Sequence, residues 1–81
     1  MNVAVETRGT NISLKAYKEH FTLYGDEMTD WGWLDGEPED FYNRVDDYLR
    51  DVLPDEGYSE WTWKSSDLKK VCKEVYKNLK K

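Results

Sequence analysis

Residues 38–53 are the stretch that most restricts how this chain can fold. Pro38 suits the first turn of a helix, and Glu39 and Asp40 complement the positive end of a helix dipole. Pro54 is expected to end the segment. Its apolar side chains recur at the spacing of one helix face: Phe41, Val45, Tyr48, Leu49 and Val52. The pattern predicts a helix over 38–53 that must bury this face against another element.

Two further helices are expected on the same grounds. Over 66–80, with Ser65 or Ser66 as the cap, the apolar positions are Leu68, Val71, Cys72, Val75, Tyr76 and Leu79. Over 12–24 they are Leu14, Tyr17, Phe21 and Tyr24, at spacings of 3, 4 and 3. The second pattern predicts a helix ending near Gly25, and a strand at 21–24 is the alternative.

Two segments alternate as strands do. Val3 and Val5 share one side of residues 2–7, and Trp61 and Trp63 share one side of residues 58–64. Residues 31–34 are a candidate third strand. We therefore expect a single α+β domain over 1–81, with three helices packed on a small two- or three-stranded sheet. An all-α three-helix bundle is the alternative.

The composition of the 81 residues narrows the class of protein. A single cysteine permits no internal disulfide framework. No apolar run approaches the roughly 18 residues of a membrane span, and residues 1–6 lack the basic and apolar regions of a signal peptide. The expectation is a cytoplasmic protein without membrane contact, a monomer or a weak homodimer.

Side chains that could carry chemistry are few. His20 is the only histidine and Cys72 the only cysteine, so together they cannot form a His/Cys metal cluster. A Cys72–His20 nucleophilic pair is conceivable, but Cys72 falls on an apolar helix face. The acidic loop starting at Asp30 lacks the ligand spacing of a calcium-binding EF-hand. We expect neither catalysis nor a metal nor another cofactor.

Charge is strongly segregated along the chain. Residues 26–60 contain 13 Asp and Glu and only Arg44 and Arg50 as basic residues, a local net charge of −11. Residues 61–81 contain seven Lys against Asp67 and Glu74, a net charge of +5. A field of this kind selects charged partners and accelerates their capture.

The acidic block predicts a surface that binds a basic protein. Carboxylates one helical turn apart lie roughly 5–6 Å from each other, a spacing that can imitate phosphates. Trp31, next to Gly32, is the tryptophan expected to be exposed and to act as a hot spot, whereas Trp61 and Trp63 are expected in the core. The candidate binding residues are Asp26, Glu27, Asp30, Trp31, Asp35, Asp40, Asp46, Asp47 and Asp51. A solvated helix face that serves only solubility is the alternative.

The C-terminal lysines suggest a different partner. Lys69, Lys73 and Lys77 recur at i, i+4 and i+8 and form a stripe that could contact the phosphates of a nucleic acid. Binding of nucleic acid through this helix is thus the alternative function, and a self-assembling adaptor is a third.

Residues 23–31, Leu-Tyr-Gly-Asp-Glu-Met-Thr-Asp-Trp, resemble a segment of the barstar-type ribonuclease inhibitors. Those proteins place a Tyr-Gly-acidic segment and a Trp between an N-terminal strand-helix unit and the inhibitory helix. By size and composition the chain also looks like the small acidic proteins with which phages and mobile elements block nucleases, toxins or CRISPR complexes. Both likenesses imply a non-enzymatic, protein-binding inhibitor that occupies a basic nucleic-acid-binding surface.

Overall fold

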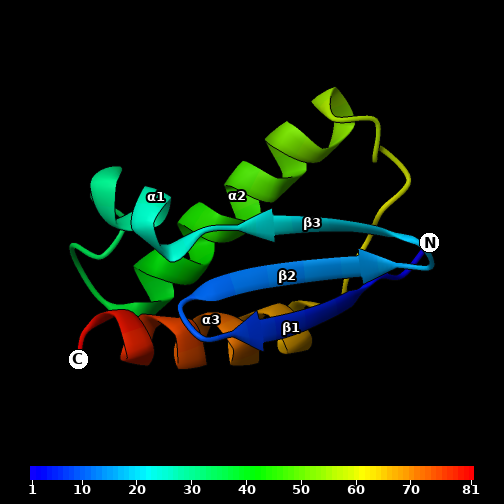
Figure 1. The fold of residues 1–81 in the computed structure, drawn as a ribbon. Helices are drawn as coiled ribbons and strands as arrows, with labels where there is room; N and C mark the ends of the chain where they lie inside the picture. The colour runs from blue at the N-terminus through cyan, green and yellow to red at the C-terminus, as the bar shows by residue number, and fades with distance from the viewer.

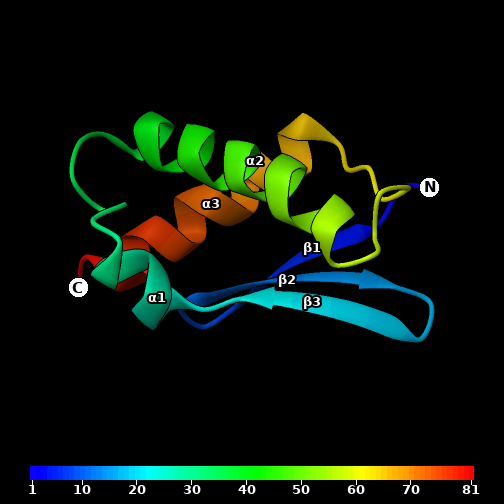
Figure 2. The same ribbon diagram turned by 90° about the horizontal axis from the view of Figure 1, so that it is seen from above.

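The computed structural model describes all residues, 1–81, and has an α+β fold. Strands β1 (Ala4–Arg8), β2 (Asn11–Ala16) and β3 (Glu19–Leu23) form an antiparallel sheet in the order β1-β2-β3. Helices α1 (Gly25–Asp30), α2 (Pro38–Asp55) and α3 (Ser65–Leu79) follow. Helices α2 and α3 cover one face of the sheet and leave the other face open (Figures 1 and 2).

The alternation of side chains in the sheet separates the core from solvent. Val5, Leu14 and Phe21 lie side by side across the three strands on the face that the helices cover. The neighbouring row on the open face is Ala4, Lys15 and His20, all exposed. An antiparallel sheet can carry one apolar and one polar face in this way.

Both hairpins close with two-residue loops, because Arg8 pairs with Asn11 and Ala16 pairs with Glu19. The first residue of each loop has a positive φ, +62° at Gly9 and +58° at Tyr17. Glycine adopts this conformation without steric cost, whereas a residue with a Cβ does not. Tyr17 therefore carries backbone strain, and its side chain is fully exposed at the tip of the β2–β3 hairpin.

The predicted helix over 12–24 is wrong, since this stretch forms β2 and β3. Leu14 and Phe21 are core residues, but as cross-strand neighbours rather than members of one helix face. Tyr17 and Tyr24, the other two members of that pattern, are exposed. The apolar side chains that the fold buries in β2 are Ile12, Leu14 and Ala16, which recur with the period of two that is typical of a strand. The barstar-like segment thus follows three strands rather than a strand-helix unit.

The structure has instead a short helix, α1, after β3. It begins at Gly25, near the point where the predicted helix over 12–24 was expected to end. The Gly25 N–H donates to Asn11 Oδ1 at 2.9 Å, which fixes the start of α1 against the first residue of β2. A Cβ at position 25 would collide with the Thr10 carbonyl oxygen, so glycine is required by this close approach.

The strand predicted over 58–64 is also wrong in extent. Only Thr62 pairs with another strand-like segment, in a parallel bridge to Asn2, with Val3 N to Thr62 O and Thr62 N to Met1 O both 2.8 Å. Residues 31–34 do not form a strand; they are a turn between α1 and α2. The sheet consequently has three strands, none of which comes from 58–64.

The helices over 38–53 and 66–80 are confirmed, with α2 extending to Asp55, one residue beyond Pro54. At the start of α2 the Glu37 N–H donates to Asp40 Oδ2 at 2.9 Å. The core between helices and sheet is one cluster, with Leu14, Phe41, Leu49, Leu68 and Val75 fully buried. No helix of this fold is both long enough and apolar enough to span a bilayer.

Candidate protein-interaction surface

Helix α2 presents three parallel rows of side chains outside the core. Arg44 and Tyr48 face the turn after α1: the Arg44 Nη1 donates to the Gly32 carbonyl at 2.8 Å, and the Tyr48 ring lies against Trp31. On the opposite flank, Asp46 and Arg50 contact Trp63. Asp47 and Asp51, one turn apart, lie between these two rows on the solvent side.

The first flank is an aromatic cluster formed by Trp31, Trp33 and Tyr48. The ring centroids are 5.0 Å apart for Trp31–Trp33 and 5.2 Å apart for each tryptophan with Tyr48. These are favourable tilted or edge-on arrangements. Trp31 is 44% exposed, as expected from the sequence, while Trp33 and Tyr48 are half-buried.

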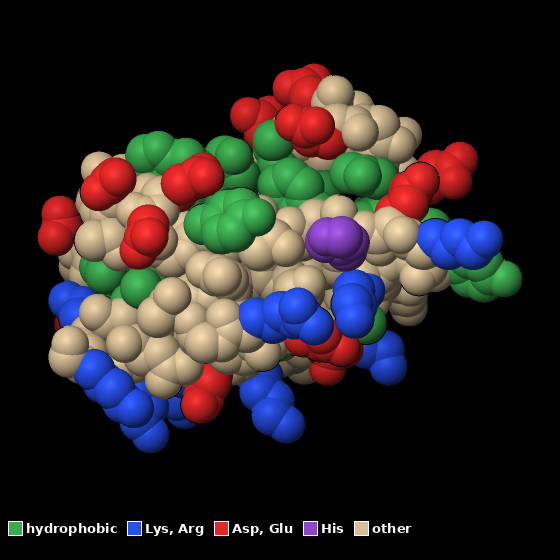
Figure 3. Space-filling model, viewed as in Figure 1, with side chains coloured by type: hydrophobic (Ala, Val, Ile, Leu, Met, Phe, Trp, Pro, Cys, Tyr) green, Lys and Arg blue, Asp and Glu red, His purple; other side chains and the backbone are tan.

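Acidic groups approach this cluster from two directions. Burial, followed by the charges of Glu27 in α1 and Glu56 after α2, raises the pKa of Tyr48. Figure 3 shows acidic side chains over α1 and over the C-terminal end of α2, with hydrophobic side chains between the two groups. We call the residues Glu27, Trp31, Trp33, Tyr48, Asp47, Asp51 and Glu56 the acidic-aromatic surface.

The predicted acidic residues divide into those held within the chain and those that are free. Asp40 accepts the Glu37 N–H, and Asp46, half-buried, accepts from Trp63 Nε1 and from Arg50 Nε. The hydrogen bond and the charge of Asp46 also raise the pKa of the Arg50 guanidinium. Neither a hydrogen bond nor an ion pair within the chain engages the carboxylates of the remaining predicted residues, which are Asp26, Glu27, Asp30, Asp35, Asp47 and Asp51; all six are exposed.

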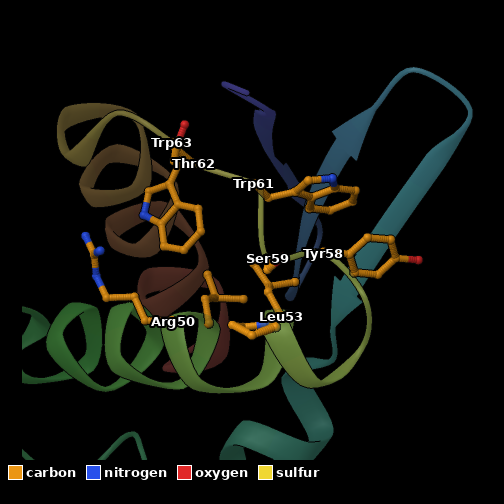
Figure 4. Close-up of a pocket in the computed structure, with 9 residues that line it drawn as sticks. Arg50, Leu53, Tyr58, Ser59, Trp61, Thr62 and Trp63 are labelled. Atoms are coloured by element: carbon orange, nitrogen blue, oxygen red, sulfur yellow. The ribbon is translucent and has the colours of Figure 1, made fainter.

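The second flank of α2 borders a pocket of about 290 Å³ (Figure 4). Trp61, 6% exposed, and Leu53 form buried parts of its wall, and Arg50 lies at one side with its guanidinium 5.4 Å from the Trp63 ring centroid. Its lining is Leu49, Arg50, Leu53, Pro54, Tyr58, Ser59, Trp61, Thr62 and Trp63. Such an apolar pocket beside a charged row can receive one side chain of a partner.

The sequence did not predict that the side chains of Tyr48, Trp63 and Tyr17 are partly or fully exposed to solvent. Tyr48 and Trp63 were expected in the core, whereas both are half-buried: Tyr48 contacts the exposed Trp31, and Trp63 donates a hydrogen bond to Asp46 on α2. The helical spacing predicts how Arg44, Tyr48 and Asp51 are placed relative to one another. It does not predict the contact of Tyr48 with Trp31, which lies across the turn after α1.

The C-terminal lysines lie away from the acidic groups. Lys69, Lys73 and Lys77 are exposed on α3, and the Lys69 ammonium is 5.4 Å from the centroid of the Tyr42 ring. In Figure 3 the upper part of the molecule and α1 carry acidic side chains, whereas the lower part carries most of the basic side chains together with a few acidic ones. The face seen in this view is thus acidic at the top and mostly basic at the bottom.

The structure also separates the two candidate groups for nucleophilic chemistry. Cys72 is buried in α3, and burial together with the charge of Asp46 raises the pKa of its thiol to about 12. His20 lies on the open face of the sheet, on the opposite side from the helices. The pair does not form, and no group of three or more His, Cys, Asp or Glu side chains is placed to hold a metal ion.

Comparison of the chain with models of known protein families, with curated proteins and with solved structures gave no significant match.

Proposed function

We propose that this chain is a non-enzymatic inhibitor that binds the basic, nucleic-acid-binding surface of a nuclease, toxin or defence complex. The observation that supports this most is the aromatic cluster of Trp31, Trp33 and Tyr48, in which Trp31 is exposed and which lies between the acidic side chains of α1 and those of α2 (Figure 3). An apolar centre with a charged rim is the usual anatomy of a protein-binding patch. Cytoplasmic action, as for the small acidic anti-defence proteins of phages, belongs to this proposal.

Free carboxylates would supply the imitation of phosphates. Asp47 and Asp51 are exposed, lie on one face of α2 and have no partner within the chain. Because these two residues are one helical turn apart, their Cβ atoms are expected roughly 5–6 Å from each other. Asp40 and Asp46 already accept hydrogen bonds from their own chain, so they contribute charge and local structure more than direct contacts.

The proposal is tested by capture of a partner and its displacement by nucleic acid. The immobilised chain is exposed to a lysate freed of nucleic acid, and bound proteins are then challenged with duplex DNA or RNA. We expect retention that falls steeply with salt and release by the polyanion, because both compete for one basic surface.

A matched pair of variants makes the test specific. Glu27→Gln, Asp47→Asn and Asp51→Asn together remove three charges from the acidic-aromatic surface. Glu6→Gln, Asp67→Asn and Glu74→Gln remove three charges elsewhere. The first variant should lose the partner and the second should keep it. Equal loss in both, or a partner that nucleic acid does not displace, contradicts the proposal.

Nucleic-acid binding through α3 is the competing function, favoured by the exposure of Lys69, Lys73 and Lys77 on one helix. A gel-shift assay at low salt separates the two. Strong retention of DNA or RNA that disappears when these three lysines are changed to Glu would replace the inhibitor proposal.

A further inference from the structure

One edge of strand β1 is not paired with another strand. The hydrogen bond between Val3 and Thr62 shows which backbone groups of β1 point toward this edge. Within the sheet β1 pairs only with β2, and just before β1 the Val3 N–H donates outward to the Thr62 carbonyl. Backbone groups in a strand alternate in direction with a period of two residues. The N–H and C=O groups of Val5 and Thr7 therefore also point outward, and no strand pairs with them.

A shallow groove of about 580 Å³ follows this open edge. One side is the strand itself, Ala4 to Thr7, and the other is α3. The helix contributes residues from two successive turns: Asp67, Lys70, Val71 and Glu74. Extended peptides are bound by strand addition at exposed sheet edges, and neighbouring pockets for their side chains supply specificity.

We propose that this groove binds an extended peptide segment of another protein as a fourth, antiparallel strand, with small apolar and basic side chains in alternation. Side chains on the helix side of the added strand would lie near Val5, Thr7 and Val71, which favours small apolar residues. Those on the open side would lie next to Glu6. Of the acidic residues of the groove, Glu6 lies on the open side and can face a basic side chain directly, whereas Asp67 and Glu74 lie on α3 beside Lys70 and attract the peptide through its overall positive charge.

A second copy of the chain fits this edge poorly. Antiparallel pairing of two β1 strands about Glu6 would bring the two Glu6 side chains together, and each copy has a net charge of −5. Like charges directly opposite across strands are unfavourable. Pairing about Thr7 would instead place Glu6 opposite Arg8, and there it is the net charge of −5 on each copy that disfavours self-association relative to a basic peptide.

The test uses acetyl-Lys-Val-Lys-Val-Lys-amide as the probe, titrated into isotope-labelled protein and followed by NMR. In the antiparallel register the valines lie opposite Val5 and Thr7, so their amides face β1. We expect the shifts to concentrate on Val5, Thr7 and Val71. Methylation of the two valine nitrogens should weaken binding about tenfold, because two backbone hydrogen bonds are lost. A Glu-Val-Glu-Val-Glu peptide should not bind.

Proline variants supply the matched control within the chain. Thr7→Pro removes an N–H that points outward from β1, which an edge strand tolerates. Thr22→Pro makes the same change on the far edge, in β3, where the register of the Ala16–Glu19 hairpin also points residue 22 outward. Binding should fall in Thr7→Pro and persist in Thr22→Pro.

Several results would overturn the proposal. They are absence of shifts at the β1 edge, equal affinity of the N-methylated peptide, and a concentration-dependent dimer that Thr7→Pro abolishes. The inference does not rest on the acidic-aromatic surface. The variant that neutralises Glu27, Asp47 and Asp51 should bind the peptide normally, and the one that neutralises Glu6, Asp67 and Glu74 should not.

Discussion

The Trp63 indole Nε1–H donates a hydrogen bond to Asp46 Oδ1 at 3.2 Å, and this contact joins the segment before α3 to the middle of α2. The other oxygen of the same carboxylate accepts from Arg50 Nε at 2.9 Å, so one side chain holds both a ring and a cation. Asp46 was expected to face a partner, but its two bonds give it a structural task.

Replacement of Asp46 by Ala should therefore destabilise the fold, while replacement of Asp47 by Ala should not. Loss of the hydrogen bonds to Trp63 and Arg50 should cost about 1–2 kcal/mol of unfolding free energy, measured by urea denaturation. Asp47→Ala removes an exposed charge from a crowded acidic helix and should be neutral or slightly stabilising. Equal effects of the two changes would mean that Asp46 is an ordinary surface charge.

Replacement of Tyr17 by Gly should stabilise the chain. Its φ of +58° costs a residue with a Cβ roughly 1–2 kcal/mol, and glycine removes this cost at the price of greater freedom in the unfolded state. A net gain of about 1 kcal/mol corresponds to a rise of about 4–8 °C in melting temperature for a domain of this size.

The control for this prediction is Tyr17→Ala, which keeps the backbone strain and should not raise the melting temperature. A similar rise in both variants would show that exposure of the aromatic ring, rather than φ, is unfavourable.

Gly25→Ala should destabilise the fold by about 1–3 kcal/mol, because the new Cβ would collide with the Thr10 backbone. Gly57→Ala is the comparison, since only its φ of +90° opposes a side chain and no atom lies within 4 Å. Thermal unfolding of both variants should show the larger loss at position 25. A smaller loss there would mean that α1 moves away from Thr10 at little cost.

Stability should fall at high pH through Cys72. Burial raises the pKa of this thiol from 9.0 to about 12, so between these values the unfolded chain loses a proton that the folded chain keeps. Unfolding is then favoured by about 1.4 kcal/mol for each pH unit above 9. Below pH 9 the thiol contributes no pH dependence.

Denaturation of the wild type and of Cys72→Ala between pH 8 and pH 11 measures this effect. The wild type should lose more stability over the interval than the variant. Parallel curves would show that the thiol is accessible in the folded state.

The sequence predicted the elements that have a single consistent period. Helix α2 and helix α3 each combine a five- or six-member apolar face with a start signal, and both are present. The stretch from Leu14 to Tyr24 fits helix and strand alike, because Leu14 and Phe21 are seven residues apart, which is two helical turns and also a cross-strand pair. No Gly or Asn marks the Tyr17-Lys18 loop, so the turn that separates the two cases could not be seen.

Much the same holds for the candidate site. Exposure of Trp31 follows from its position beside Gly32 in an acidic loop, and it was predicted correctly. That Tyr48 meets Trp31, and that Asp46 meets Trp63, depends on how the loops fold back on α2, over separations of 17 residues. Such contacts come from tertiary packing and have no local pattern.

The two backbone hydrogen bonds that join Met1 and Val3 to Thr62 have a consequence for the order of folding. The two hairpins of the sheet close over two-residue loops and can form quickly, whereas the bridge between residues 2 and 62 must close a loop of about sixty residues. We therefore expect the hairpins to appear early and this bridge to form late. The edge formed by residues 1–8 would then be exposed along its whole length until the last step, when Thr62 covers the part that precedes β1.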